Sequence, residues 1–251
     1  MKTALLNLFK PSLLAAGIAA ASLAMMPSSA QAFSILFGPD SFSSNPTRTG
    51  SSAKVDFNFS QVGSDVLLDL ALTNTTGQIP TFGDGATEST LVGFGFDILD
   101  GLTFAYNPLS STFTQLYGNS SLTSQTVLGS ATLQPFGTFD VGIRSAGPGN
   151  FNGGNPQQGL DEGQSTNVSF TLSGANLNAA DVESEFLSGF QSGTLRVSTR
   201  FQSVNAGERS DKLLGGNIVK RRVPEPATLA GIGLVAGVMV ISRRRKAIKF
   251  A

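Results

Sequence analysis

The chain contains no cysteine, no histidine and no tryptophan. Without cysteine it can form neither a disulfide framework nor a thiolate metal site, so its stability has to come from packing. Without histidine it cannot build Ser-His-Asp or Cys-His catalytic sites, or the usual zinc sites. These absences exclude most familiar hydrolase mechanisms. We therefore expect a noncatalytic protein with no metal and no cofactor.

The N-terminal segment has the three parts of a secretory signal peptide. Two lysines precede an apolar run at 12–26, and the small residues Ala30 and Ala32 follow with one residue between them. The run is short for a membrane span, and small residues at this spacing are typical of signal peptidase sites. We predict a signal peptide over residues 1–32, cut between Ala32 and Phe33. The alternative is an uncleaved N-terminal anchor.

Residues 33–222 are expected to form one exported domain. A segment of about 190 residues is long enough to bury a single core. It holds ten basic and sixteen acidic residues, although the whole chain has 17 of each. Such an acidic surface favours solubility and disfavours nucleic acid or anionic lipid as a partner.

Apolar and polar residues alternate at seven places in this domain, which is typical of strands with one buried face. The alternating segments are 55–59, 66–72, 92–98, 102–106, 139–143, 168–172 and 195–201. Residues 61–64 have the length and the glycine of a hairpin loop, and Asp100-Gly101 suits a tight turn. The predicted fold is all-β: an antiparallel sandwich of Greek-key topology, Ig-like or jelly-roll-like.

One short helix and one long loop interrupt the strands. Asn178 can cap the start of a helix in which Val182 and Phe186 share a face, and Gly189 is expected to end it. Residues 147–164 are rich in Gly, Asn and Gln, and we predict that they form a long exposed loop.

The C-terminal tail, residues 223–251, has three ordered parts. These are the element Val223, Pro224, Glu225 and Pro226, the apolar run 227–241, and the cations Arg243, Arg244, Arg245 and Lys246 within the basic end 243–249. Fifteen helical residues span about 22 Å, which is shorter than the hydrocarbon core of about 30 Å. Such a transmembrane helix anchors the chain only weakly in the membrane. The cations stay on the cytoplasmic side and stop transfer. The prolines keep residues 223–226 extended, and a processing enzyme can bind an extended, unpaired backbone.

Together these parts resemble the PEP-CTERM sorting signal of Gram-negative-type bacteria. The resemblance covers about the last tenth of the chain. It implies that a membrane-embedded exosortase recognises the element at 223–226, removes the tail, and passes the protein to the cell surface or the exopolysaccharide matrix. The implied partners are signal peptidase, the exosortase, the inner membrane that holds the precursor, and exopolysaccharide. A plain C-terminal anchor is the alternative.

The domain also resembles, more loosely, the exported domains that precede such tails, in the stretches 159–174 and 199–216. This likeness implies a fold and a destination and brings no catalytic residue. The expected function is that of a noncatalytic surface or matrix protein.

A glycan-binding or adhesion module is the first alternative function. The two tyrosines are few for a sugar-binding surface, and the nineteen phenylalanines suit a core better. Arg196 and Arg200 share an outward strand face, which can meet an acidic glycan or pair with carboxylates across the sheet.

A carboxylate-dependent glycosidase is the second alternative. Asp161 and Glu162 are adjacent in the long loop, and Glu183 and Glu185 are expected on a solvated helix face. Neither spacing identifies a catalytic pair. Asp161 and Glu162 are also hard oxygen ligands of the kind calcium prefers, but no known calcium-loop pattern organises them.

Overall fold

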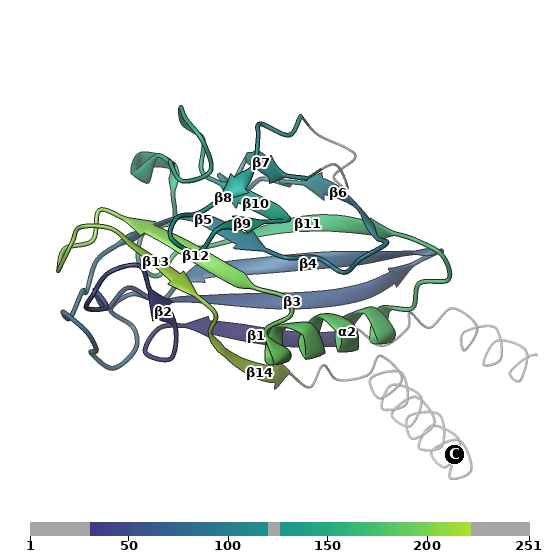
Figure 1. Ribbon diagram of the computed structural model, residues 1–251, viewed down its shortest axis with the longest axis horizontal. Helices are drawn as coiled ribbons and strands as arrows, with labels where there is room; N and C mark the ends of the chain where they lie inside the picture. The colour runs from purple at the N-terminus through teal and green to yellow at the C-terminus, as the bar shows by residue number, and fades with distance from the viewer. Residues whose placement is uncertain (1–30, 120–125, 222–251) are drawn as a thin grey trace, which may run out of the picture. The chain divides into compact units, whose positions relative to one another are not determined.

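The computed structural model describes residues 31–119 and 126–221 (Figure 1). These residues form two six-stranded antiparallel sheets, a two-stranded hairpin and one α-helix, as expected for a β-sandwich. The predicted transmembrane segment 227–241 and basic end 243–249 lie outside the described residues. Within the described ranges, no helix has the length and apolar character needed to cross a membrane.

Sheet 1 has the strand order β14-β1-β3-β4-β11-β6. Its strands are β1 (Gln31–Phe37), β3 (Ala53–Val62), β4 (Asp65–Asn74), β6 (Thr103–Asn107), β11 (Ser165–Ser173) and β14 (Asn217–Arg221). Buried and partly exposed residues alternate along β3 and β4, as predicted. Val62 pairs with Asp65, so the predicted hairpin turns at Gly63 and Ser64. Gly63 has φ 62°, a conformation that residues with a side chain rarely adopt.

Sheet 2 has the strand order β2-β13-β12-β5-β10-β7. Its strands are β2 (Phe42–Ser43), β5 (Thr90–Phe96), β7 (Gln115–Gly118), β10 (Val141–Arg144), β12 (Val197–Gln202) and β13 (Asp211–Leu214). Every residue of β5 and β10 is buried, so this sheet is covered on both faces. The short strands β8 (Ala131–Thr132) and β9 (Thr138–Phe139) form a separate hairpin.

The predicted turn at Asp100-Gly101 connects the two sheets. Gly101 has φ 80°, as a tight turn requires. However, β5 before the turn belongs to sheet 2 and β6 after it belongs to sheet 1. The turn therefore carries the chain across the sandwich and does not form a hairpin.

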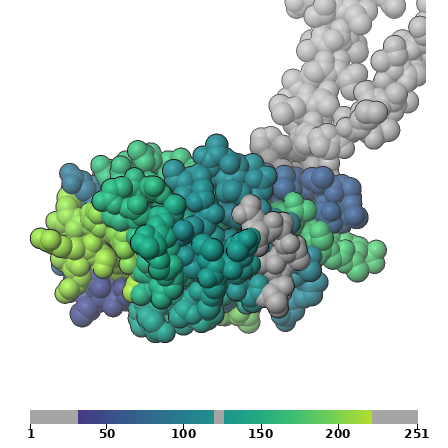
Figure 2. All heavy atoms as spheres, turned by 90° about the horizontal axis from the view of Figure 1, so that it is seen from above, coloured from purple at the N-terminus to yellow at the C-terminus, as the bar shows by residue number. Residues whose placement is uncertain are grey.

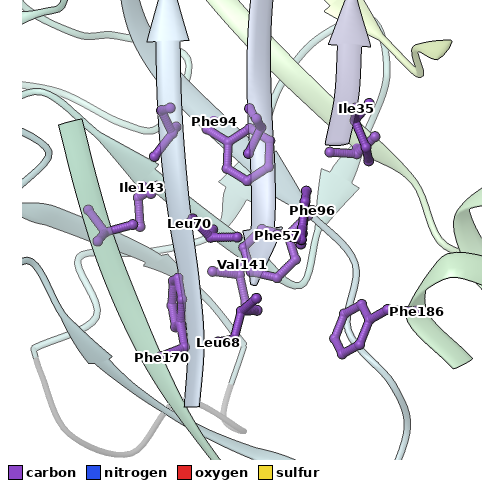
Figure 3. Close-up of a cluster of buried hydrophobic side chains, with 14 of the residues drawn as sticks. Ile35, Phe57, Leu68, Leu70, Phe94, Phe96, Val141, Ile143, Phe170 and Phe186 are labelled. Carbon is purple, nitrogen blue, oxygen red and sulfur yellow. The ribbon is translucent and has the colours of Figure 1, made fainter. Parts of the chain in front are cut away.

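Phenylalanines fill the space between the sheets, as the sequence predicted (Figure 3). Phe57 of sheet 1 meets the edges of Phe94 and Phe96 of sheet 2, with ring centroids 6.1 and 6.2 Å apart. Phe170 meets Phe96 in the same way at 5.6 Å. Such edge-to-face pairs contribute beyond the apolar area that they bury.

The α-helix of the described residues, α2 (Ala179–Ser192), packs against β1, β3 and β4. Asn178 caps its start, as predicted, by accepting from the backbone N–H of Ala180 at 2.9 Å. The predicted end at Gly189 is wrong, because the helix continues to a left-handed cap at Gly193 with φ 78°. A Cβ at Gly189 would lie 2.6 Å from the side chain of Leu195, so close packing explains that glycine.

The segment 147–164 is less exposed than predicted. Its Phe151 and Leu160 are 1% and 4% exposed, and Leu160 exchanges two backbone hydrogen bonds with Leu91 of β5. A 3₁₀ turn, η1 (Pro156–Gln158), lies between them and is capped by Asn155. The segment thus folds back onto sheet 2. Figure 2 shows this side of the molecule, where teal and green atoms of the middle of the chain lie together.

Candidate functional site

Two of the predicted processing residues lie within the described domain. Ala32 and Phe33 are both buried in β1. Ala32 pairs in register with Arg221, the last residue of β14. The predicted signal boundary and the end of the described domain therefore meet on neighbouring antiparallel strands. The other predicted residues lie outside the described part: Ala30, the element 223–226 and the cations 243–246.

The carboxylates proposed for a glycosidase lie on two separate segments, Asp161 and Glu162 in the long segment and Glu183 and Glu185 on α2. Asp161 and Glu162 are exposed, and Asp161 accepts a hydrogen bond from Thr90 Oγ1 at 3.1 Å. The prediction that both helix glutamates are exposed to solvent is wrong for Glu183, which is buried, and confirmed for Glu185. Burial raises the pKa of Glu183, and Lys220 opposes that rise. Across the described ranges, no three His, Cys, Asp or Glu residues converge as a metal ion would require.

A cavity of about 660 Å³ lies where α2 meets the ends of sheet 2, and four carboxylates line it. They are Asp97, Asp100, Asp140 and Glu185. Asp97 is held by Arg196, and the carboxylate of Asp140 accepts from the backbone N–H of Ile98 at 3.1 Å and from Asn119 at 2.9 Å. Two of the four carboxylates thus have structural roles.

Arg196 pairs with a carboxylate across the sheet, which was one of its two predicted roles. Its Nε donates to Asp97 Oδ2 at 2.8 Å and its Nη2 to Oδ1 at 3.2 Å. It also donates to the carbonyls of Phe136 and Thr138 and lies over the ring of Phe139. Arg196 therefore ties the β8–β9 hairpin to sheet 2.

Arg200 has quite different surroundings on the outer face of the same sheet. In register it pairs with Gly93 of β5 on one side and with Lys212 of β13 on the other. Gly93 in turn pairs with Arg144 of β10. Arg144, Arg200 and Lys212 thus lie in one line across four strands, and we call them the cationic row. A Cβ on Gly93 would contact both arginines at 3.6 and 3.7 Å.

Arg144 is fully buried at one end of the cationic row. Its Nε donates to Tyr117 Oη at 2.9 Å, and its Nη2 donates to the carbonyls of Gly147 and Gly149 at 2.7 and 3.1 Å. Its Nη1 has no partner among the described residues. Neutral carbonyls solvate this guanidinium but do not cancel its charge.

Arg200 and Lys212 are half-buried and also lack a carboxylate ion-pair partner in the described part of the chain. Arg200 Nη1 donates to Asn152 at 3.1 Å, while its buried Nε has no partner in the described part of the chain. Lys212 Nζ donates to the carbonyl of Gln134 at 2.7 Å. None of the ion pairs found within the described ranges involves the row.

The pKa values reflect this lack of counter-charge. Burial, and then the charge of Arg144, lower the pKa of Arg200 to about 10. Burial and Arg200 lower the pKa of Lys212, while Asp211 opposes the change. Because a group with a pKa of 10 is still protonated at neutral pH, Arg200 remains a cation beside Arg144.

Sequence reasoning singled out Arg200 but missed Arg144 and Lys212. Arg144 follows the apolar residues of β10, which gives no sign of a site. The available signal was glycine at alternate outward positions, Gly93 and Gly95 in β5 with Gly142 in β10, because glycine inside a strand often marks a close approach by another segment.

Comparison with protein-family models, curated proteins and solved structures gives no match to this chain. The fold defines a mostly β protein with two large antiparallel sheets and one helix.

Proposed function

We propose that this chain is a noncatalytic exported protein of the cell surface or extracellular matrix, processed at both ends. The single observation that carries the proposal is the pairing of Ala32 with Arg221. Ala32 is the last residue of the predicted signal peptide, and Arg221 precedes Val223, where the sorting element begins, by two positions. A precursor held by either end would thus be held at the same corner of sheet 1.

The tail supplies the second part of the proposal. In this account, 227–241 is a weak transmembrane helix, Arg243 to Lys246 stop transfer, and an exosortase cuts near Pro224 to Pro226. β14 supports this role because it is an edge strand. The chain therefore leaves the domain at the border of a sheet, where an enzyme has access.

The burial of Ala32 implies an order of events. Ala32 is 3% exposed and lies between β14 and β3. A peptidase needs an extended, unpaired backbone, so the signal peptide is cut before sheet 1 closes around β1. The mature strand then begins at Phe33, whose ring stacks on Phe57 at 4.8 Å.

Fractionation of a bacterium with and without its exosortase gene tests the proposal. Glu225→Gln should leave the precursor in the membrane fraction, as should loss of the gene. Neutral residues at Arg243 to Lys246 should weaken membrane retention. Lys249→Gln, a charge change outside that run, is the matched control. Unchanged processing of the Glu225→Gln variant, together with unchanged membrane retention of the variant neutralised at 243–246, would refute the sorting role.

A second candidate function, binding of an acidic glycan, is favoured by one observation. The domain is acidic overall, yet three cations lie in one row on one face, and none of the ion pairs within the described ranges involves them. A glycosidase is less favoured, because Asp97 and Asp140 have structural partners. We also propose that the sandwich is of the Ig-like or jelly-roll-like Greek-key kind.

A further inference from the structure

Two arginines on one outward face of sheet 2 provide an internal comparison. Arg196 holds the carboxylate of Asp97 with its Nε and Nη2, which is the bidentate geometry that guanidinium groups favour. Arg200 follows four positions later on the same face, and its Nε has no partner among the described residues. The nitrogen that binds a carboxylate in Arg196 is thus left unused in Arg200.

The surroundings of Arg200 call for negative charge. Arg144 and Lys212 flank it along the cationic row, and a buried charge is costly unless it is paired. Asp211, next to Lys212, has other partners: its carboxylate accepts from the backbone N–H and hydroxyl of Thr49 and from Ser43. It is therefore committed to the loop before β3.

Other polar atoms around Arg200 are unsatisfied as well. Ser198 Oγ and Gln202 Oε1 are buried without a partner in the described chain, and Arg144 Nη1 is too. Ser198 and Gln202 lie two residues before and after Arg200 in β12. Buried polar groups of folded proteins nearly always have hydrogen-bond partners, so these atoms require partners from outside the described chain, either water or a bound anion.

We propose that the cationic row is a binding site for an oxyanion, a carboxylate or a sulfate, held between Arg200 and Lys212 with the buried charge of Arg144 behind them. Both direct ligands are half-buried and have long side chains. Arg200 Nε is buried without a partner among the described residues, and the neighbouring Lys212 Nζ can donate to the same anion.

Two segments define the borders of this site. Asn152, in the segment 147–164, accepts a hydrogen bond from Arg200. The carbonyl of Gln134, in the turn between β8 and β9, accepts one from Lys212. The hairpin lies against sheet 2, since a Cβ on Gly142 of β10 would lie 2.9 Å from Ala131 of β8. The long segment and the hairpin therefore both contribute polar atoms next to the proposed site.

If the proposed extracellular destination is correct, the oxyanion is a uronate or sulfate group of an acidic polysaccharide. Free small anions carry the same chemistry. A polymer would bind more tightly than its monomer, because neighbouring acidic sugars can rebind at one site. The test separates these two sources.

Titration of the purified full-length chain in detergent at pH 7 tests the site without depending on export or processing. The probes are sodium sulfate, glucuronate and polygalacturonate, with dextran as a neutral polymer, all at constant ionic strength so that charge screening is held fixed. The variants are Arg200→Gln and Lys212→Gln. Lys220→Gln is the matched control, since Lys220 is an exposed cation on sheet 1.

The proposal predicts that sulfate or glucuronate raises the melting temperature of the unaltered chain, because a ligand that binds only the folded state stabilises it. Arg200→Gln and Lys212→Gln should each weaken binding at least tenfold, and Lys220→Gln should not. Tighter binding of polygalacturonate than of glucuronate identifies a glycan site, and equal binding identifies a small-anion site.

A stability measurement without ligand separates this role from a merely structural one. Lys212→Gln should raise the melting temperature, because it removes one of three neighbouring like charges. A structural lysine would lower it. The proposal is overturned if no anion stabilises the unaltered chain, or if Arg200→Gln and Lys212→Gln respond to anions as the unaltered chain does.

Discussion

The outer faces of the two sheets differ in both cover and charge. On sheet 1, Asp56 pairs with Lys54 at 2.9 Å and with Arg221 at 3.3 Å, all partly exposed. On sheet 2, a second layer of chain covers the face, and Arg144 and Arg200 form none of the ion pairs found within the described residues. A solvent-exposed face whose charges are paired requires only polar residues. A covered, unbalanced face costs stability, and such costs are characteristic of functional sites.

Phe151→Ala should produce the largest effect and tests whether the cover of sheet 2 is a second core. Phe151 is 1% exposed and packs with Tyr117 at a centroid distance of 5.7 Å. Its removal should cost about 3–4 kcal/mol in the free energy of unfolding, measured with urea. Leu36→Ala, on the open face of sheet 1, is the control and should cost under about 1 kcal/mol. Equal losses would remove the distinction between the faces.

Gly142→Ala should have the next largest effect. A Cβ there would lie 2.7 Å from Phe151 and 2.9 Å from Ala131, so either the long segment or the hairpin has to shift. We expect a loss of about 1–3 kcal/mol in urea unfolding. Gly95→Ala, whose nearest neighbours lie at 3.2 Å, should cost less. The reverse order would show that Phe151 does not press on Gly142.

Glu183→Gln should have a smaller effect of opposite sign, because α2 buries a carboxylate of its own. Burial raises the pKa of Glu183, so its charged form destabilises the fold above the normal pKa of glutamate. The variant should melt at a higher temperature at pH 7, and its advantage should disappear as the pH falls and Glu183 becomes protonated. Glu185→Gln, an exposed control, should show little of this pH dependence. A constant difference at all pH values would contradict the cause given.

Lys54→Gln should have the smallest effect and tests the other side of the comparison. The Lys54–Asp56 pair is partly exposed, and such pairs contribute little. The expected loss is under about 0.5 kcal/mol by thermal melting, and it should shrink further in high salt. A loss above 2 kcal/mol would show that sheet 1 also depends on its outer charges.

The sequence predicted sheet 1 better than sheet 2, for a physical reason. Strands such as β3 and β4 meet water on one face, so their alternation of apolar and polar residues reports burial directly. β5 and β10 are buried on both faces, and several of their outward positions hold glycine, with one arginine at the end of β10. A period of two still identified them as strands, but it gave no sign of a second layer.

The candidate site was predictable only in part. Arg200 was identified from its outward position, whereas its neighbours come from β10 and β13, which only the folded sheet brings together. The prediction of an exposed loop at 147–164 was wrong because Phe151 is buried. Its ring packs where Gly95 and Gly142 have no side chains, and that space comes from other strands. Contacts between distant segments leave no periodic trace in one sequence.

The mass of the intact protein recovered from outside the cell tests the central claim most directly. The account predicts a chain that begins at Phe33 and ends between Val223 and Pro226. A recovered chain that still ends at Ala251, from cells that possess an exosortase, would contradict it.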